Sequence, residues 1–147
     1  MNFKHLIILS IVTIVTVGCT TDITSNQTDT PTPTTVTSPV AEAGSFQDAE
    51  HSTQGRVSVI TEEGKSYLEF DQNFKTDNGP DLFVILHRSE IPPVSDIQEK
   101  DYVSIAALEN INGTQRYALP DDLNLPDFKS VAIWCRQFNT TFGYAVL

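Results

Sequence analysis

In the segment DNGPDLFVILH, residues 77–87, a dense turn signal is followed directly by an apolar run. Asn78, Gly79 and Pro80 favour a turn, and the residues between Asp81 and His87 are all apolar. A short run that is apolar on both faces is typical of a strand packed between other layers. We therefore expect residues 81–87 to form a central strand.

Other strand-like runs lie on both sides of this segment. Residues 56–60 and 66–71 alternate apolar with polar positions around the turn sequence EEGK, which predicts a β-hairpin. Further runs are separated by turn signals such as Asn112-Gly113, and they occupy residues 102–108, 114–119, 129–135 and 141–147. Helical periodicity is weak apart from one turn near residues 95–100. The sequence predicts an all-β domain, either a β-sandwich or a closed β-barrel.

The N-terminus has the features of an export signal. Lys4 is followed by an apolar core that ends in Gly18-Cys19, and this core is short for a membrane span but suits a signal peptide. The site resembles a bacterial lipoprotein signal, in which Cys19 receives lipid and becomes the new N-terminus, although Thr16 stands where Leu is usual. The alternative is an ordinary secretory signal with an incidental cysteine. We expect residues 1–18 to be removed.

The predicted lipid on Cys19 sets the expected location. Acyl chains contribute roughly 0.8 kcal/mol of membrane attachment per buried CH₂ group, so several chains on one residue hold a protein durably. Residues 19–44 are rich in Thr, Ser and Pro and predict a disordered spacer, which leaves residues 45–147 as the single folded domain. We expect the protein in the cell envelope, anchored through Cys19, with its domain facing the periplasm or exterior.

The charge of the chain excludes some partners. The formal net charge is −10, and the predicted cleavage removes Lys4 but no acidic residue. A chain this acidic is repelled by nucleic acid and by anionic lipid headgroups. The membrane contact that we expect is therefore the lipid on Cys19 alone, and nucleic acid is not expected as a partner.

Cys135 is the second of two cysteines and needs an explanation in an exported protein. In a strand it shares one face with Val131 and Ile133, while Trp134 and Arg136 lie on the other. One interpretation is a buried, inert small hydrophobe. The other is a reactive thiolate near the strand end, favoured by the charge of Arg136. A disulfide is disfavoured because Cys19 is committed to lipid.

Few other residues suggest chemistry. His51 follows Asp48-Ala49-Glu50 in a polar loop, where it could supply an imidazole ligand or base or could simply hydrogen-bond the backbone. Asp77, Asn78 and Asp81 offer oxygen ligands, but their spacing does not match a Ca²⁺-binding loop. The sequence has no zinc, phosphate-loop or nucleophile-elbow motif, so it does not indicate an enzyme.

Six short motifs occur together in order across residues 45–147 and resemble the DM-thirteen family, also called the electron-transfer domain. They are Gly44-x-Phe46, His51-x-x-x-Gly55, Gly79-Pro80-Asp81-Leu82, Gly113-x-Gln115-x-Tyr117-x-Leu119-Pro120, Ile133-Trp134-Cys135-x-x-Phe138 and Phe142-Gly143-x-Ala145-x-Leu147. The resemblance implies an extracellular β-rich module with a redox or haem-linked role centred on a cysteine. The position that matches that cysteine is Cys135.

Two functional hypotheses follow. In the first, the domain is a lipid-anchored redox or cofactor-binding module that uses Cys135 and His51; the cofactor is unknown, with haem as the candidate, and so is the redox or protein partner. No second cysteine stands at a redox-pair spacing, so a bound group must carry the electrons. In the second, the domain is a non-catalytic envelope binding module in which Cys135 is structural.

Overall fold

A computed structural model describes residues 40–147. The predictions for the signal peptide, the lipidation of Cys19 and residues 20–39 of the spacer lie outside the described residues. Within residues 40–147 the regular structure consists of β-strands and two 3₁₀ turns, Glu99–Asp101 and Leu125–Asp127, and contains no α-helix. The predicted all-β class is confirmed. The described part of the chain also contains no helix long and apolar enough to cross a membrane.

The strands follow the order of the sequence prediction, with three additions. In chain order they are β1 (Val40–Asp48), β2 (Thr53–Gln54), β3 (Arg56–Glu62), β4 (Lys65–Phe70), β5 (Lys75–Thr76), β6 (Leu82–His87), β7 (Tyr102–Ala107), β8 (Gln115–Ala118), β9 (Ser130–Cys135) and β10 (Thr140–Val146). The predicted hairpin is β3–β4, whose turn residues Glu63 and Gly64 both have positive φ, at 50° and 79°. Near residues 95–100, where the sequence suggested one helical turn, the structure has the 3₁₀ turn Glu99–Asp101.

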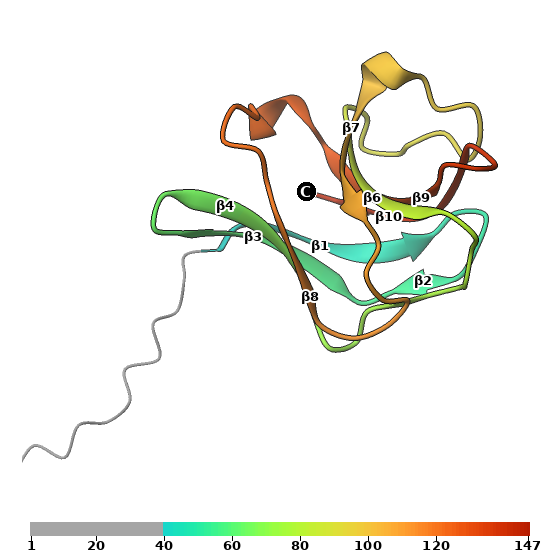
Figure 1. The fold of residues 1–147 in the computed structure, drawn as a ribbon, viewed down its shortest axis with the longest axis horizontal. Coiled ribbons are helices and arrows are strands. Elements are labelled where there is room, and N and C mark those ends of the chain that lie inside the picture. The colour runs from blue at the N-terminus through green and yellow to red at the C-terminus, as the bar shows by residue number, and fades with distance from the viewer. Residues whose placement is uncertain (1–39) are drawn as a thin grey trace, which may run out of the picture. The chain divides into compact units, whose positions relative to one another are not determined.

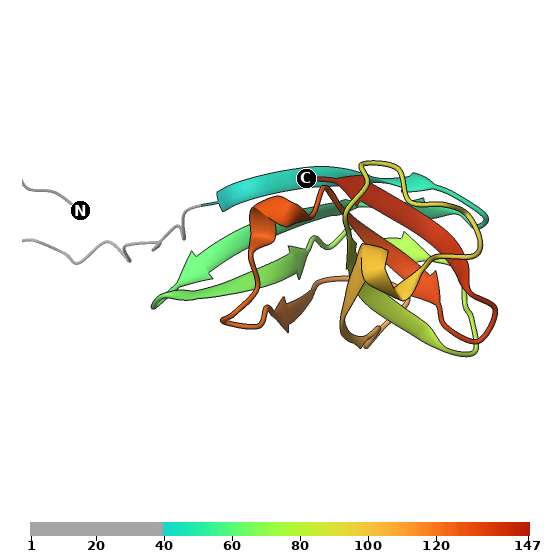
Figure 2. The same ribbon diagram turned by 90° about the horizontal axis from the view of Figure 1, so that it is seen from above.

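Eight strands form one antiparallel sheet in the order β7-β6-β9-β10-β1-β3-β4-β8, and β2 pairs with β5 in a small second sheet (Figure 1). The edge strands β7 and β8 approach each other, so the large sheet curls into a nearly closed barrel. Figure 2 shows β1 (cyan) along one side, with the β3–β4 hairpin (green) and the β9–β10 hairpin (orange to red) towards opposite ends. The sequence left sandwich and barrel open, and the near closure of one sheet favours the barrel.

β1 is the main difference from the sequence prediction. It begins at Val40, inside the segment expected to be spacer, and pairs with both β3 and β10. The run from Ala41 to Gly44 is small and polar, a composition that strands usually avoid. Gly44 is nevertheless suited to this place, because a Cβ there would lie 2.0 Å from the carbonyl oxygen of Val146. β1 joins the two halves of the sheet and so completes the barrel.

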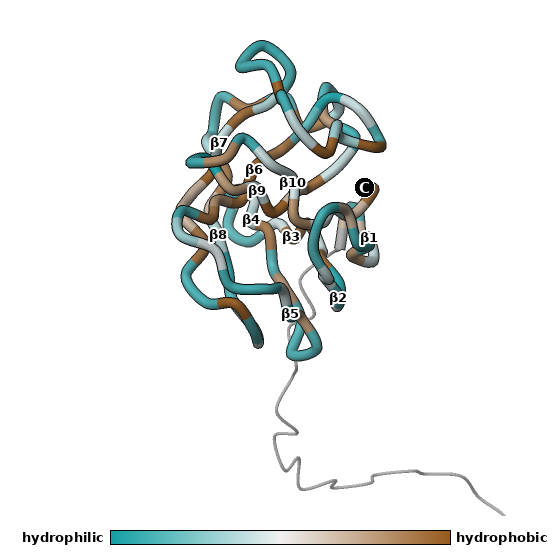
Figure 3. The backbone as a smooth tube through the Cα atoms, turned by 90° about the vertical axis from the view of Figure 1, so that its right-hand side faces the viewer, coloured by the Kyte–Doolittle hydropathy of each residue, from teal (hydrophilic) through white to brown (hydrophobic). Residues whose placement is uncertain are grey.

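The core explains why β6 and β9 are apolar on both faces. One face points into the barrel, where buried residues from both halves of the sheet form the main cluster; it includes Leu82, Val84, Leu86, Val131, Ile133 and Cys135. The other face, with Ile85, Ala132 and Trp134, packs under Ile97 of the long connection to β7. Figure 3 shows this as brown segments near the centre of the described domain and mainly teal loops around it. The prediction of a doubly buried strand at residues 81–87 is confirmed.

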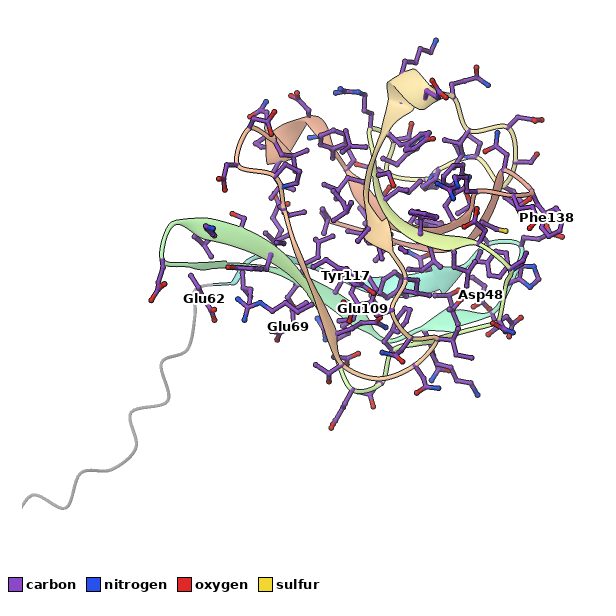
Figure 4. All side chains as sticks on the ribbon, viewed as in Figure 1. Asp48, Glu62, Glu69, Glu109, Tyr117 and Phe138 are labelled. Carbon is purple, nitrogen blue, oxygen red and sulfur yellow. The ribbon has the colours of Figure 1, made fainter. Side chains whose placement is uncertain are left out.

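Hydrogen bonds fix the connection that crosses from β7 to β8. The Tyr117 hydroxyl donates to Gln115 Oε1 and accepts from the Glu109 backbone N–H at 3.1 Å. Gln115 also exchanges two hydrogen bonds with the backbone of Asn110. Burial raises the pKa of Tyr117 to about 12, so its phenol stays protonated. Figure 4 shows Tyr117 and Glu109 close together at this crossing.

Candidate functional site

Cys135 is the last residue of β9 and is completely buried. Its exposed fraction is 0%, and its cross-strand partners are Leu82 of β6 and Thr140 of β10. It is the one cysteine among the described residues, and it is free. The predicted alternation with Val131 and Ile133 is confirmed, because these side chains belong to the same core cluster. The position favours the interpretation of Cys135 as a packed hydrophobe.

Arg136 does not activate the thiol. Its guanidinium donates two hydrogen bonds to the carboxylate of Asp81, at 2.9 and 3.3 Å, and lies 4.4 Å from the ring centroid of Phe83. Adjacent residues of a strand point to opposite faces, so the charge of Arg136 is directed away from Cys135. The charge of Arg136, which the sequence suggested as a stabiliser of a Cys135 thiolate, is therefore paired with Asp81 instead.

His51 lies just after β1 and is held on two sides. Its Nδ1 is 3.2 Å from Asp77 Oδ2, and its ring stacks on Phe142 with centroids 3.8 Å apart. The side chain is 38% exposed. A carboxylate on Nδ1 fixes the tautomer and leaves Nε2 as the nitrogen that can accept a proton or bind a metal. Sequence analysis identified His51 but not these two partners.

Beside His51 the surface is hollowed into an open depression of about 460 Å³. Its lining comes from segments far apart in sequence; it includes His51, Gly79, Pro80, Val94, Phe138 and Phe142, together with the polar residues Glu50, Asn78, Ser95 and Thr140. A volume of this order is typical of small-molecule sites, which fall at roughly 300–1,000 Å³. The depression combines apolar walls with one oriented imidazole.

Gly79 forms part of this lining for a packing reason. A glycine before a proline can adopt a positive φ, but Gly79 is not among the residues with positive φ. A Cβ on Gly79 would lie 2.8 Å from Leu82 Cδ2 and 2.9 Å from Phe142 Cζ. The glycine therefore lets the turn rest directly on these two side chains, one of which is the cross-strand partner of Cys135.

The opposite wall is tied to the β9–β10 turn. Thr141 donates its N–H to the Val94 carbonyl at 2.8 Å and its hydroxyl to the Pro93 carbonyl at 2.6 Å. Asn139, with φ of 47°, accepts from Trp134 Nε1 and donates to the Ile97 carbonyl. These hydrogen bonds fix the positions of Val94 and of Phe138, which both line the depression. These contacts were not predictable, because residues 93–97 carry no strand pattern.

The carboxylates considered as oxygen ligands at residues 77–81 contact two other side chains, those of His51 and Arg136. Asp77 contacts His51, and Asp81 contacts Arg136. Residues 40–147 contain no group of three or more His, Cys, Asp or Glu side chains placed to hold a metal ion. The two carboxylates of this turn therefore position the side chains of His51 and Arg136.

Comparison with known proteins decides the family. Residues 45–147 match the family described as electron transfer DM13. The chain belongs to this DM13 family. No curated protein and no solved structure matches the chain. The DM13 motifs that are widely separated in sequence, those containing His51, Gly79, Phe138 and Phe142, converge on the depression.

The DM13 fold can be tested for its fit to haem, the cofactor candidate. His51 would suit a haem-iron ligand, since its Nδ1 is held by a carboxylate and its Nε2 is left free beside apolar side chains. Cys135 does not fit, because a thiol with 0% exposure in an apolar cluster cannot reach a bound group without opening of the sheet. The residue that suits a cofactor in this DM13 domain is His51.

Proposed function

We propose that this DM13 protein is an extracytoplasmic electron-transfer module, anchored to a membrane by lipid on Cys19, that holds its electron carrier against His51. The observation that carries the proposal is the stacked and hydrogen-bonded imidazole at the wall of an apolar depression. The description of the family as an electron-transfer domain supports the redox part. The sequence of residues 1–19 supports the anchor.

The protein residues have defined parts in this proposal. Asp77 keeps the proton on His51 Nδ1, so that the lone pair of Nε2 is free to bind iron. Carboxylates have this role behind metal-bound histidines. Phe142 holds the imidazole ring in a fixed plane, and Phe138 and Val94 shield one side of the depression from water. A haem, when bound, supplies one-electron chemistry at its iron.

The role of Cys135 is different from the one that the family resemblance implies. A thiolate ligand needs access to the bound group, and complete burial of Cys135 among apolar side chains removes that access. In our proposal Cys135 supports the depression from the core through its strand partner Leu82. In this proposal the redox site is therefore at His51, at the end of the barrel, and not at Cys135.

Haem titration of the full chain tests the cofactor and its ligand. We expect a Soret band that is lost in His51→Ala, weakened in Asp77→Asn and retained in Cys135→Ala. Circular dichroism of each variant checks that the fold survives. A band that depends on Cys135 and not on His51 would show a thiolate ligand. The absence of any Soret band in the unaltered protein would exclude the haem form of the proposal.

The anchor has its own test. Cys19→Ala removes the acyl acceptor, so we expect the unprocessed chain to accumulate or the protein to leave the membrane fraction. Metabolic labelling with a radioactive fatty acid should mark the unaltered protein and not the variant. Normal processing and membrane partition of Cys19→Ala would contradict the lipoprotein assignment.

A second function is favoured by the burial of Cys135 and by large apolar side chains on the surface. Ile91, Val94 and Phe138 are 68%, 45% and 63% exposed. In this alternative the domain is a non-catalytic envelope module that binds a partner through its loops, with Cys135 in a structural role. A colourless protein with an inert Cys135 thiol would support this function over the first.

A further inference from the structure

Large apolar side chains are exposed at the end of the barrel where the depression lies. Val94 and Phe138 line the depression, and Ile91 lies in the same loop as Val94. Ile111, 37% exposed, lines a second depression on the other side of the Asn78-Gly79-Pro80 turn. Figure 4 shows Phe138 at the outer edge of the domain. We call Val94, Phe138 and the Gly79-Pro80 turn the apolar patch; exposed apolar groups gathered in this way mark interaction sites.

The patch is fixed before any partner arrives. Backbone hydrogen bonds join Thr141 to Val94 and Asp96 to Asn139, at 2.8 and 3.2 Å. A bridge between Ser95 and Thr140 continues this pairing along the segment. A surface whose backbone is already ordered loses less conformational entropy when it binds. The patch is therefore suited to docking a folded partner.

Two exposed carboxylates lie on the segments that line the depression, and we call them the rim of the patch. Glu50 lines the depression, and Asp96 follows Ser95, which also lines it. Both side chains are exposed, and within residues 40–147 neither forms an ion pair. The cation Arg136 at this end is bound to Asp81. The rim therefore presents negative charge that the domain does not neutralise.

The negative charge around the patch distinguishes between the partners that could bind it: a second copy of the chain, a lipid surface or another protein. A second copy would bring Glu50 and Asp96 against the same carboxylates, and the chain as a whole carries a net charge of −10. An anionic lipid surface would be repelled in the same way. A protein with an apolar centre ringed by lysines or arginines matches both the patch and its rim.

We propose that the apolar patch and its acidic rim dock a basic protein through a lysine- or arginine-ringed apolar surface. The inference uses the same end of the barrel as the proposed function but needs no bound cofactor. Complementary rim charges steer the encounter, and Phe138 provides the buried contact at the centre. The interaction is therefore sensitive to ionic strength.

The test uses the cofactor-free full chain and cytochrome c, a small basic protein with an apolar haem edge among lysines, as the probe. We expect binding at low ionic strength, with amide shifts in residues 93–97 and 137–142. Glu50→Lys with Asp96→Lys should weaken binding by about tenfold or more, because tenfold corresponds to about 1.4 kcal/mol. Phe138→Ser should weaken it without changing its dependence on salt.

The matched control is Asp121→Lys with Asp122→Lys, which changes the net charge equally at exposed positions away from the patch. We expect this pair to weaken binding much less than the rim pair. Equal losses for the two pairs, amide shifts confined to segments that contain no residue of the patch or its rim, or no binding at low salt would each overturn the proposal. A Phe138-dependent dimer of the chain would identify a second copy as the occupant and would also overturn it. Soret titration in the absence of probe tests the proposed cofactor separately, so the two failures are distinguishable.

Discussion

His51 stacks on Phe142 with ring centroids 3.8 Å apart and ring planes inclined by 32°. The contact joins the segment after β1 to the middle of β10, and backbone hydrogen bonds reinforce it, since the N–H groups of Ala49 and His51 both donate to the Phe142 carbonyl. Phe142 is buried, while His51 is half-exposed. The imidazole thus stands on a rigid base at the surface, which is the arrangement that a ligand or a partner can use.

Cys135 should behave as a core residue. In a Cys19→Ala background, we expect Cys135 to react with an alkylating reagent only at the rate of global unfolding, because its exposed fraction is 0%. Cys135→Ser should lower the free energy of unfolding by about 1–3 kcal/mol, since it buries a hydroxyl in an apolar cluster. Cys135→Ala, measured by the same urea titration, separates the cost of polarity from that of lost volume. Rapid alkylation of the folded protein would contradict the packed thiol.

Gly79 should resist enlargement because of its neighbours. Gly79→Ala places a Cβ less than 3 Å from Leu82 and Phe142, and we expect it to destabilise the domain by about 1–3 kcal/mol. Asn78→Ala, one residue earlier and exposed, is the matched control. Shortening one neighbour should relieve the clash, so Gly79→Ala with Leu82→Val should cost less than the sum of the single changes. Strict additivity in thermal unfolding would argue against the steric explanation.

His87 should make stability depend on pH. Burial lowers its pKa from the ordinary value of 6.5, outweighing the opposing effects of the Ser89 hydrogen bond and of Asp101. The Ser89 N–H donates to Nδ1 at 3.0 Å, and Nε2 is buried without a partner among residues 40–147. The unfolded chain then binds a proton more readily than the folded one. Stability should fall as the pH drops from 6.5 towards the lowered pKa, and this contribution should be constant above 6.5.

The comparison uses His87→Asn, which can still accept the Ser89 hydrogen bond but does not titrate. Free energies of unfolding at about pH 7.5 and about pH 5.5 should differ less in this variant than in the unaltered protein. His51→Asn, at a half-exposed position, is the control for losing a histidine. An equal pH dependence in His87→Asn and the unaltered protein would show that His87 does not contribute.

Residues 40–44 should contribute to the folded domain. They pair with β3 from Val40 to Gly44, so a chain that begins at residue 45 loses part of that ladder. We expect it to remain mostly β by circular dichroism but to be less stable than residues 40–147 by at least about 1 kcal/mol, the typical net value of one hydrogen bond. Equal stability of the two chains would place the beginning of the domain at residue 45.

The strand class and most strand positions could be predicted from the sequence. Apolar runs between turn signals identified β3, β4 and β6 through β10; β3 and β4 alternate with period two, and β6 is apolar on both faces. The turn between β3 and β4 was also indicated, because Gly64 readily adopts the positive φ of 79° that it has there. Ordered motifs identified the family, and the match over residues 45–147 agrees with them.

The position of β1 and the surroundings of the site could not be predicted from the sequence and follow from the folded structure. β1 is stabilised by backbone pairing on both sides, and backbone hydrogen bonds leave little trace in side-chain pattern. The stacking of His51 on Phe142 and the position of Phe138 depend on contacts between distant segments. Whether Cys135 was reactive or packed could not be read from alternation, because both faces of β9 are buried. The second face is covered by the connection to β7, whose residues carry no regular pattern.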